Sequence, residues 1–293
     1  MKSSLIFLLL GLAVIFSDEA LPQSGISSNE IIVGYYGRPG APRLGILGQH
    51  SIEELTPLVQ ARAAEYGQLN SDWTVTPAFH LIYGLAAADP GRKKDYILPL
   101  SHDKLMQYIN AARSSGFLVF IDTQLGAMTP VEAVKPVLQY LEYDNVHLAI
   151  DPEFEVNGLD VRPGKVIGHV TAEEVNEVQK TMSGYLAENG IEGNKILMVH
   201  SFTDGMVQNK PAIEANDRIR LILNLDGHGS PQLKVKIYNG LYTQHSASKN
   251  IAGGFKLFSQ EDKPAMMTPG QVMALDPVGN SKIGVPPTYI NYQ

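Results

Sequence analysis

The feature of this sequence that most constrains its fold is an alternation of short apolar runs with longer segments of helical periodicity. Eight runs rich in β-branched and aromatic residues predict strands. They cover residues 31–36, 75–83, 117–124, 146–153, 195–202, 219–226, 254–258 and 288–292. Most of the runs are apolar almost throughout instead of alternating with polar residues, which indicates parallel strands that are covered on both faces.

Between the strands, apolar residues recur with the period of a helix. The segments with this pattern are 53–66, 103–115, 130–143, 172–189 and 268–275, with weaker patterns over 212–216 and 233–242. Capping motifs support two of these predictions, because Ser51 precedes Glu54 and Thr171 precedes Glu174 by the three residues of a capping box. Strands that alternate with helices in this way predict an α/β protein.

The number of strands favours a closed barrel over an open sheet. Eight parallel strands with intervening helices form a (β/α)8 TIM barrel, and closure leaves no strand edge exposed. An open, doubly wound sheet would show the same alternation, but no glycine-rich dinucleotide fingerprint follows a strand here. We therefore predict a single barrel domain over residues 26–293, a length that such barrels commonly have.

The N-terminal segment, residues 1–25, has the pattern of a signal peptide. Lys2 precedes an apolar run over 5–16, which is shorter than the roughly 20 residues that span a bilayer. Asp18 and Glu19 stand where small residues usually precede a cleavage site, so an uncleaved anchor remains an alternative. We expect a secreted or cell-surface protein that contacts membrane only through this segment.

Composition excludes several classes of partner and site. The formal net charge of −7 argues against nucleic-acid binding, which depends on Lys and Arg contacts with phosphates. The chain has no cysteine and therefore no disulfide or thiolate metal site. It also lacks a P-loop and a GxSxG motif, so neither nucleotide chemistry nor a serine hydrolase is expected, and no cofactor is predicted.

The most specific chemical motif is Asp151-Pro152-Glu153, at the end of the fourth predicted strand. Alternation along a strand places Asp151 and Glu153 on one face, and in a barrel the active site lies at the C-terminal ends of the strands. Two carboxylates in one site shift each other's pKa apart, which gives the acid and the base or nucleophile that glycoside hydrolysis needs. We expect Glu153 to be the general acid and Asp151 its electrostatic partner or nucleophile.

Other polar residues at the strand ends are candidates for the same site. Asp122 and Asp226 are expected to assist catalysis, and the expected substrate, a polysaccharide or cell-envelope glycan, would contact further side chains. These substrate-binding candidates are Tyr35, Tyr36, His80, Tyr83, Gln124, Glu155, His200, Asn224, His228 and Lys256. Phe154, Phe202 and Phe258 add aromatic faces that suit sugar rings.

Two other functions fit the same residues. A non-catalytic barrel could bind glycan or another envelope component through the same mouth. A metal-dependent hydrolase could use a cluster drawn from Asp122, Asp151, Glu153, His200, Asp226 and His228. The sequence contains no HxH or HExxH pair, so the prediction names no metal ligand.

The Asp-x-Glu motif at the end of the fourth strand resembles that of the Chalaropsis-type lysozymes, secreted barrels that hydrolyse peptidoglycan. That family carries an acidic residue on its first strand where this chain has Tyr35 and Tyr36. Residues 31–293, with the segments 34–37, 151–153 and 254–258, also resemble uncharacterised secreted or lipoprotein-like bacterial barrels with a glycosidase-like fold. These resemblances imply the barrel fold and, for the first family, glycan hydrolysis.

Overall fold

The computed structural model describes residues 29–242 and 251–293, and within them the chain forms a closed barrel. β1 pairs with β11 on one side and with β2 on the other, and this second pairing closes the sheet. All pairings around the barrel are parallel, which confirms the predicted (β/α)8 fold. The eight barrel strands are β1 (Glu30–Gly37), β2 (Thr74–Ala86), β4 (Leu118–Gln124), β5 (Val146–Asp151), β7 (Lys195–Ser201), β9 (Ile219–Leu225), β10 (Ala252–Leu257) and β11 (Tyr289–Tyr292).

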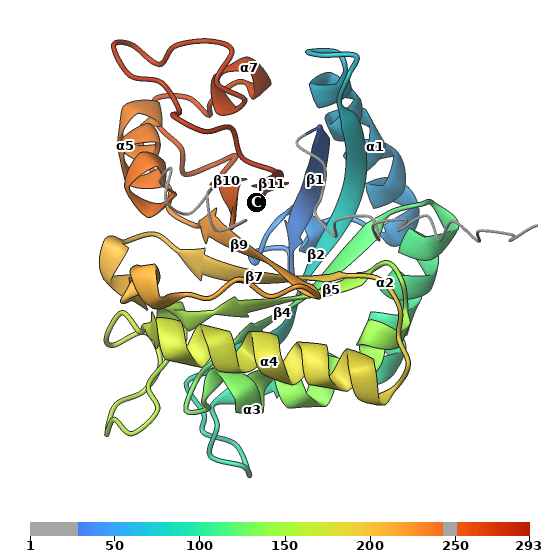
Figure 1. Ribbon diagram of the computed structural model, residues 1–293, viewed down its shortest axis with the longest axis vertical. Helices are drawn as coiled ribbons and strands as arrows, with labels where there is room; N and C mark the ends of the chain where they lie inside the picture. Colours follow the sequence, from blue (N-terminus) through green and yellow to red (C-terminus); the bar gives the residue numbers. More distant parts are fainter. Residues whose placement is uncertain (1–28, 243–250) are drawn as a thin grey trace, which may run out of the picture.

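Helices cover the outside of this sheet, as Figure 1 shows for α1, α4 and α5 on three sides of the barrel. Among residues 29–242 and 251–293, the α-helices are α1 (Ile52–Gly67), α2 (His102–Ser114), α3 (Pro130–Val134), α4 (Ala172–Glu188), α5 (Pro231–Leu241) and α7 (Pro269–Val272). Short strands outside the barrel are β3 (Ile97–Pro99), antiparallel to the end of β2, and the pair β6 (Val170–Thr171) and β8 (Val207–Gln208). The 3-10 turns are η1 (Ile46–Gly48), η2 (Lys135–Glu142), η3 (Pro152–Phe154), η4 (Asp204–Met206) and η5 (Lys210–Ala212).

The predicted capping motifs are present, but three predicted helices differ in the structure. Complete capping boxes start α1 and α4. The helix expected over 130–143 is α3 followed by the 3-10 segment η2, because Pro136 has no N–H to continue the α-helical bonding. The helix expected over 268–275 is reduced to the single turn α7.

The weak helix expected over 212–216 is wrong. Only the turn η5 forms there, and the chain that follows is held by α4 instead of by its own backbone. Asn176 donates its side-chain amide to the Ala212 carbonyl oxygen and accepts the N–H of Glu214. Tertiary hydrogen bonds thus satisfy the groups that a helix would have paired.

The interior has two layers that follow from strand alternation. Side chains on the outer face of the sheet pack against the helices in the larger apolar core. Side chains on the inner face fill the lumen with a smaller cluster: Ile32, Ala78, Phe120, Ala149, Ile196, Met198, Ile222, Ala252 and Tyr289. Two residues further along several strands, toward the C-terminal ends, the inward positions become polar, as in His80, Asp122 and His200. The lumen is therefore apolar in its middle and becomes polar toward the C-terminal ends of the strands, which form the mouth of the barrel.

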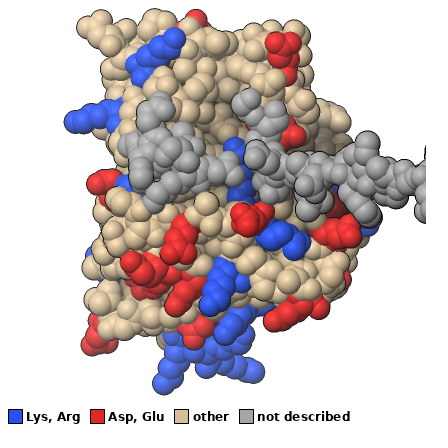
Figure 2. Space-filling model, viewed as in Figure 1, with Lys and Arg blue, Asp and Glu red and all other residues tan. Residues whose placement is uncertain are grey.

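The predicted signal peptide lies outside the described residues. Within 29–242 and 251–293, no helix is long and apolar enough to cross a membrane. Figure 2 shows side chains of both charge signs interspersed over one face of the molecule. A basic group lies at the bottom of this view, where Figure 1 draws the loop between β2 and β3 with the exposed residues Arg92, Lys93 and Lys94.

Candidate active site

A cavity of about 470 Å³ opens at the C-terminal ends of the barrel strands. Of the catalytic and substrate-binding candidates predicted from sequence, seven line it: Tyr36, Gln124, Asp151, Glu153, Asp226, His228 and Lys256. The rest of its lining is mostly apolar and includes Phe154, Phe202 and Phe258. A concave, largely apolar site with a few converging polar groups is the usual form of a small-ligand site.

Both carboxylates of the motif lie at this cavity, but Glu153 lies in a turn and not on the strand that was predicted to carry it. The strand expected to continue through Glu153 ends at Asp151, since Pro152 cannot donate a ladder hydrogen bond and starts the turn η3. Asp151 caps that turn, its Oδ1 accepting the Glu153 N–H at 3.0 Å. The Glu153 carbonyl accepts the N–H of Gly168, where any Cβ would collide with the Pro152 carbonyl oxygen. The loop thereby folds back over the turn and holds Glu153 at the cavity.

Asp151 is the deepest acid of the cavity. Its side chain is 2% exposed, and Oδ2 accepts the Gln124 amide at 3.3 Å, while Gln124 Oε1 is fixed by the Ala86 N–H at 2.8 Å. Burial, followed by the negative charges of Asp226 and Asp122, raises the pKa of Asp151 to about 7, against the opposing effect of His200. The partly buried Glu153 has a raised pKa as well, caused first by burial and then by Asp226. Near neutral pH, the cavity therefore holds a carboxylic acid.

Asp226 is instead held as a carboxylate. Lys256 Nζ lies 2.7 Å from its Oδ1, and His200 Nδ1 lies 2.9 Å from its Oδ2. Burial opposes ionisation, but Lys256 and His200 more than offset it and lower the pKa of Asp226. Lys256 also sits 3.4 Å from the centre of the Tyr36 ring, a cation–π contact. The Lys256 ammonium group and the Tyr36 ring thus pack against each other in the cavity lining.

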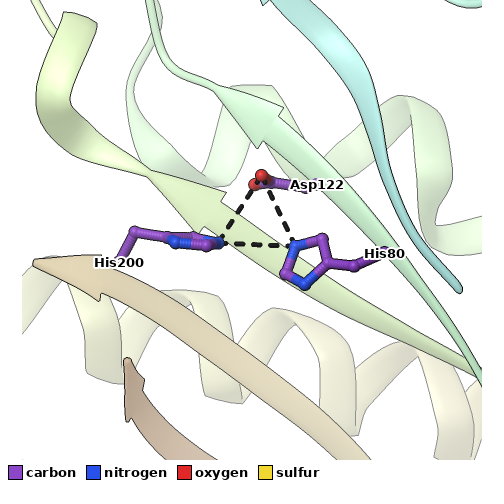
Figure 3. Close-up of side chains that lie close together, drawn as sticks. All are labelled: His80, Asp122 and His200. Atoms are coloured by element: carbon purple, nitrogen blue, oxygen red, sulfur yellow. Dashed lines mark hydrogen bonds and ion pairs between the residues drawn. The ribbon is translucent and has the colours of Figure 1, made fainter. Parts of the chain in front are cut away.

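Beneath the cavity lies a fully buried polar layer, shown in Figure 3. His80 from β2, Asp122 from β4 and His200 from β7 point toward one another, and each is 0% exposed. Asp122 Oδ2 lies 3.5 Å from Nε2 of both histidines, and the two Nε2 atoms are 3.4 Å apart. Asn224 reaches the same layer, with its Nδ2 3.2 Å from His200 Nδ1. The sequence predicted these four residues as site residues, and the structure brings them together under the cavity instead of in its lining.

The residues that could bind a metal in the structure differ from those considered from the sequence. Three side chains present donor atoms within 4.8 Å of one another, namely His80, Asp122 and His200. His80 was not among the ligands considered from the sequence. Asp151, Glu153, Asp226 and His228 were considered, and they are not part of this group.

Three further predicted substrate-binding residues lie neither in the cavity lining nor in the buried layer. Tyr35 faces outward because it neighbours the inward-facing Tyr36, and it packs edge-on against Tyr292 in the outer core. Tyr83 likewise packs against the outer core. Glu155 lies beyond η3, where its Oε1 accepts the Asn157 N–H at 2.7 Å. Alternation from Tyr36 separates Tyr35 from the site, and alternation from the inward-facing His80 separates Tyr83. Glu155 is removed from the site by the turn η3, which ends β5.

Tyr289 was not predicted from the sequence as a site residue. Tyr289 belongs to the apolar lumen cluster and contacts His80 of the buried layer. Its hydroxyl lies 2.7 Å from His80 Nδ1, and its ring is 0% exposed. The available signal was its place in the last predicted strand, two residues before the inward-facing Asn291. A polar aromatic within an apolar strand needs a hydrogen-bond partner when it is buried.

The fold and the cavity define a (β/α)8 barrel with an acidic mouth. No protein-family model and no curated protein matches the chain. Solved structures that it resembles include a mutant O-GlcNAc hydrolase of Thermobaculum terrenum, with 12% identity, 90% of this chain covered, 54% of that chain covered and a TM-score of 0.43. This chain thus spans about half the length of that protein.

Two further structures have similar values. A candidate α-L-fucosidase of Bacteroides thetaiotaomicron shares 8% identity over 97% of this chain and 91% of its own, with a TM-score of 0.44. A tri-modular endo-β-1,4-glucanase of Bacillus licheniformis shares 14% identity over 76% of this chain and 43% of its own, with a TM-score of 0.39. At these identities and TM-scores, the likenesses say nothing about the function of this chain.

Proposed function

We propose that this protein is a glycoside hydrolase that uses Asp151 and Glu153 as its acid–base pair. The observation that carries the proposal is that two carboxyl groups, Asp151 and Glu153, line one mouth cavity, where burial raises the pKa of Asp151 to about 7. A glycosidase needs a protonated carboxyl to donate to the leaving oxygen and a second carboxylate as base or nucleophile. Raising one carboxyl pKa by burial is how other enzymes retain that proton at neutral pH.

The geometry favours Asp151 as the proton donor and Glu153 as the base or nucleophile. These roles are the reverse of those expected from the sequence motif. Asp151 is the more deeply buried of the two, and burial raises its pKa to about 7. Glu153 is more exposed, so its carboxylate can approach a water molecule or an anomeric carbon in the cavity. Lys256 and His200 hold Asp226 as a carboxylate, and Asp122 is buried beneath the cavity, so we assign both residues a positioning role.

The pH dependence of hydrolysis tests the acid assignment. A general acid acts only in its protonated form, so the rate is expected to fall as the pH rises through about 7, the pKa of Asp151. The measurement is kcat/KM for an aryl or oligosaccharide glycoside across the pH range. A rate that continues to rise well above that pH would contradict the assignment of Asp151 as the proton donor.

The aromatic part of the cavity supports a carbohydrate as the ligand. Phe202 lines the cavity and is partly exposed, so one face is available to stack on a sugar ring. Phe202→Ala is expected to raise KM by the equivalent of about 0.5–1.5 kcal/mol with a smaller change in kcat. Leu44→Ala, at another apolar position of the lining, is the matched control and should change KM less. Equal effects of the two substitutions would contradict stacking.

We also propose that the protein acts outside the cytoplasm, on a polysaccharide or cell-envelope glycan. The support is the predicted signal peptide in residues 1–25. Fractionation of cells that express the full chain tests this proposal. Recovery of the whole protein in the cytosolic fraction would refute it.

A further inference from the structure

The buried layer under the cavity leaves a gap between three side chains that has the size and chemistry of a metal site. We propose that His80, Asp122 and His200 bind one divalent transition-metal ion, with Zn²⁺ as the best fit. This inference is independent of the proposed function, because none of the three side chains lines the cavity. Two imidazoles and one carboxylate are a ligand set that zinc commonly takes.

The spacing of the donor atoms matches a metal better than it matches direct hydrogen bonds. Zinc bonds to nitrogen and oxygen at about 2.0–2.1 Å, so tetrahedral ligand atoms lie about 3.3 Å apart. The three separations here are 3.4 Å between the histidine Nε2 atoms and 3.5 Å from each to Asp122 Oδ2. A charge-assisted hydrogen bond between imidazolium and carboxylate would close to about 2.7–2.9 Å. The three donor atoms instead surround a common point at nearly equal separations.

The other nitrogen of each histidine is engaged as in a metal-bound imidazole. His80 Nδ1 lies 2.7 Å from the Tyr289 hydroxyl, and His200 Nδ1 lies 2.9 Å from Asp226 Oδ2. A proton on Nδ1, donated to these partners, leaves the lone pair of Nε2 directed at the gap. Metal-ligating histidines generally use their second nitrogen in this way, which fixes the ring and its tautomer.

The unpaired oxygen of Asp122 is a second, independent observation. Asp122 Oδ1 is buried and has no hydrogen-bond partner among the described residues. A buried carboxylate oxygen without a donor costs free energy, and a cation in the gap would compensate the charge of the whole group. The Tyr36 hydroxyl, 3.2 Å from Asp122 Oδ2, stands beside the same gap and separates it from the cavity. The ion would therefore be structural and would fix Tyr36.

The test is direct binding of Zn²⁺ and Co²⁺ to the full chain. We expect the purified protein to hold about one equivalent of metal by elemental analysis. After removal by chelator it should rebind Co²⁺ with the visible absorption of a tetrahedral site, and metal addition should raise the melting temperature. Protein that neither contains nor rebinds stoichiometric metal would overturn the proposal.

Variants locate the ion. Asp122→Asn and His200→Gln should lose the Co²⁺ spectrum, whereas His147→Gln, at another buried barrel histidine outside the group, should keep it. If the ligand variants do not fold, Tyr289→Phe is the milder change, because it removes only the partner of His80 Nδ1. It is expected to weaken Co²⁺ affinity by about 10–100-fold. Unchanged affinity in Tyr289→Phe, or an intact spectrum in a folded ligand variant, would show that the ion binds elsewhere.

Discussion

Asp151→Asn is expected to lower kcat for glycoside hydrolysis by about 10²–10⁴-fold, and Glu153→Gln by a similar factor, because each removes one partner of the acid–base pair. The asparagine at 151 can still accept the Glu153 N–H and cap the turn η3, so the cavity should keep its shape. The measurement is kcat and KM of each variant on one substrate, with KM expected to change little. Turnover equal to that of the parent chain in either variant would contradict the assignment.

A stability measurement controls for misfolding and tests the same pKa. Because the folded-state pKa of Asp151 is raised, the folded chain binds that proton more tightly than the unfolded chain does. The associated stability is present below the ordinary pKa of Asp and is lost as the pH rises through about 7. Asp151→Asn escapes this loss, so its melting temperature relative to the parent should increase between about pH 4 and about pH 8. A constant difference would mean that the Asp151 pKa is not raised.

Lys234→Met is expected to cost about 3–5 kcal/mol in the free energy of unfolding, because it leaves a buried carboxylate without its cation. Lys234 and Asp262 form a pair at 2.8 Å, and both side chains are 1% exposed. Asp262 also accepts the N–H groups of Gly229 and Phe258, so the pair ties two loops to the cavity wall. Denaturant unfolding monitored by circular dichroism measures the loss.

The matched control for this prediction is a surface ion pair. Lys210 pairs with Asp204, whose side chain is 84% exposed, and Lys210→Met should cost no more than about 1 kcal/mol. Equal losses in the two lysine variants would indicate that the general effect of the substitution, and not burial of Asp262, sets the cost.

The parts of the fold that the sequence predicted well are those set by local pattern. All eight strands were predicted from local runs rich in β-branched and aromatic residues, and the starts of α1 and α4 from their capping boxes. The segment 212–216 failed because its backbone groups are paired by Asn176, on a helix distant in sequence. Local periodicity contains no information about such a partner.

The sequence predicted at which end of the barrel the site lies, but it did not predict which residues line the cavity and which lie buried beneath it. Strand ends correctly located Asp151, Asp226 and Lys256 at the cavity, since parallel strands end together. The stagger between neighbouring strands sets the height of each inward-facing residue in the barrel. That height decides whether the residue lines the cavity or lies in the buried layer. His80 and His200 are in the lower layer for this reason, and their meeting with Asp122 required the barrel to close.

The central claim, hydrolysis of a glycosidic bond in the mouth cavity, is tested most directly by product formation. The measurement is the release of reducing ends or aglycone from a panel of polysaccharides and aryl glycosides by the purified full chain. We expect release from at least one member of the panel, and we expect both Asp151→Asn and Glu153→Gln to abolish it. Saturable binding of a glycan to the cavity without any product would contradict the account and identify the protein as a glycan-binding barrel.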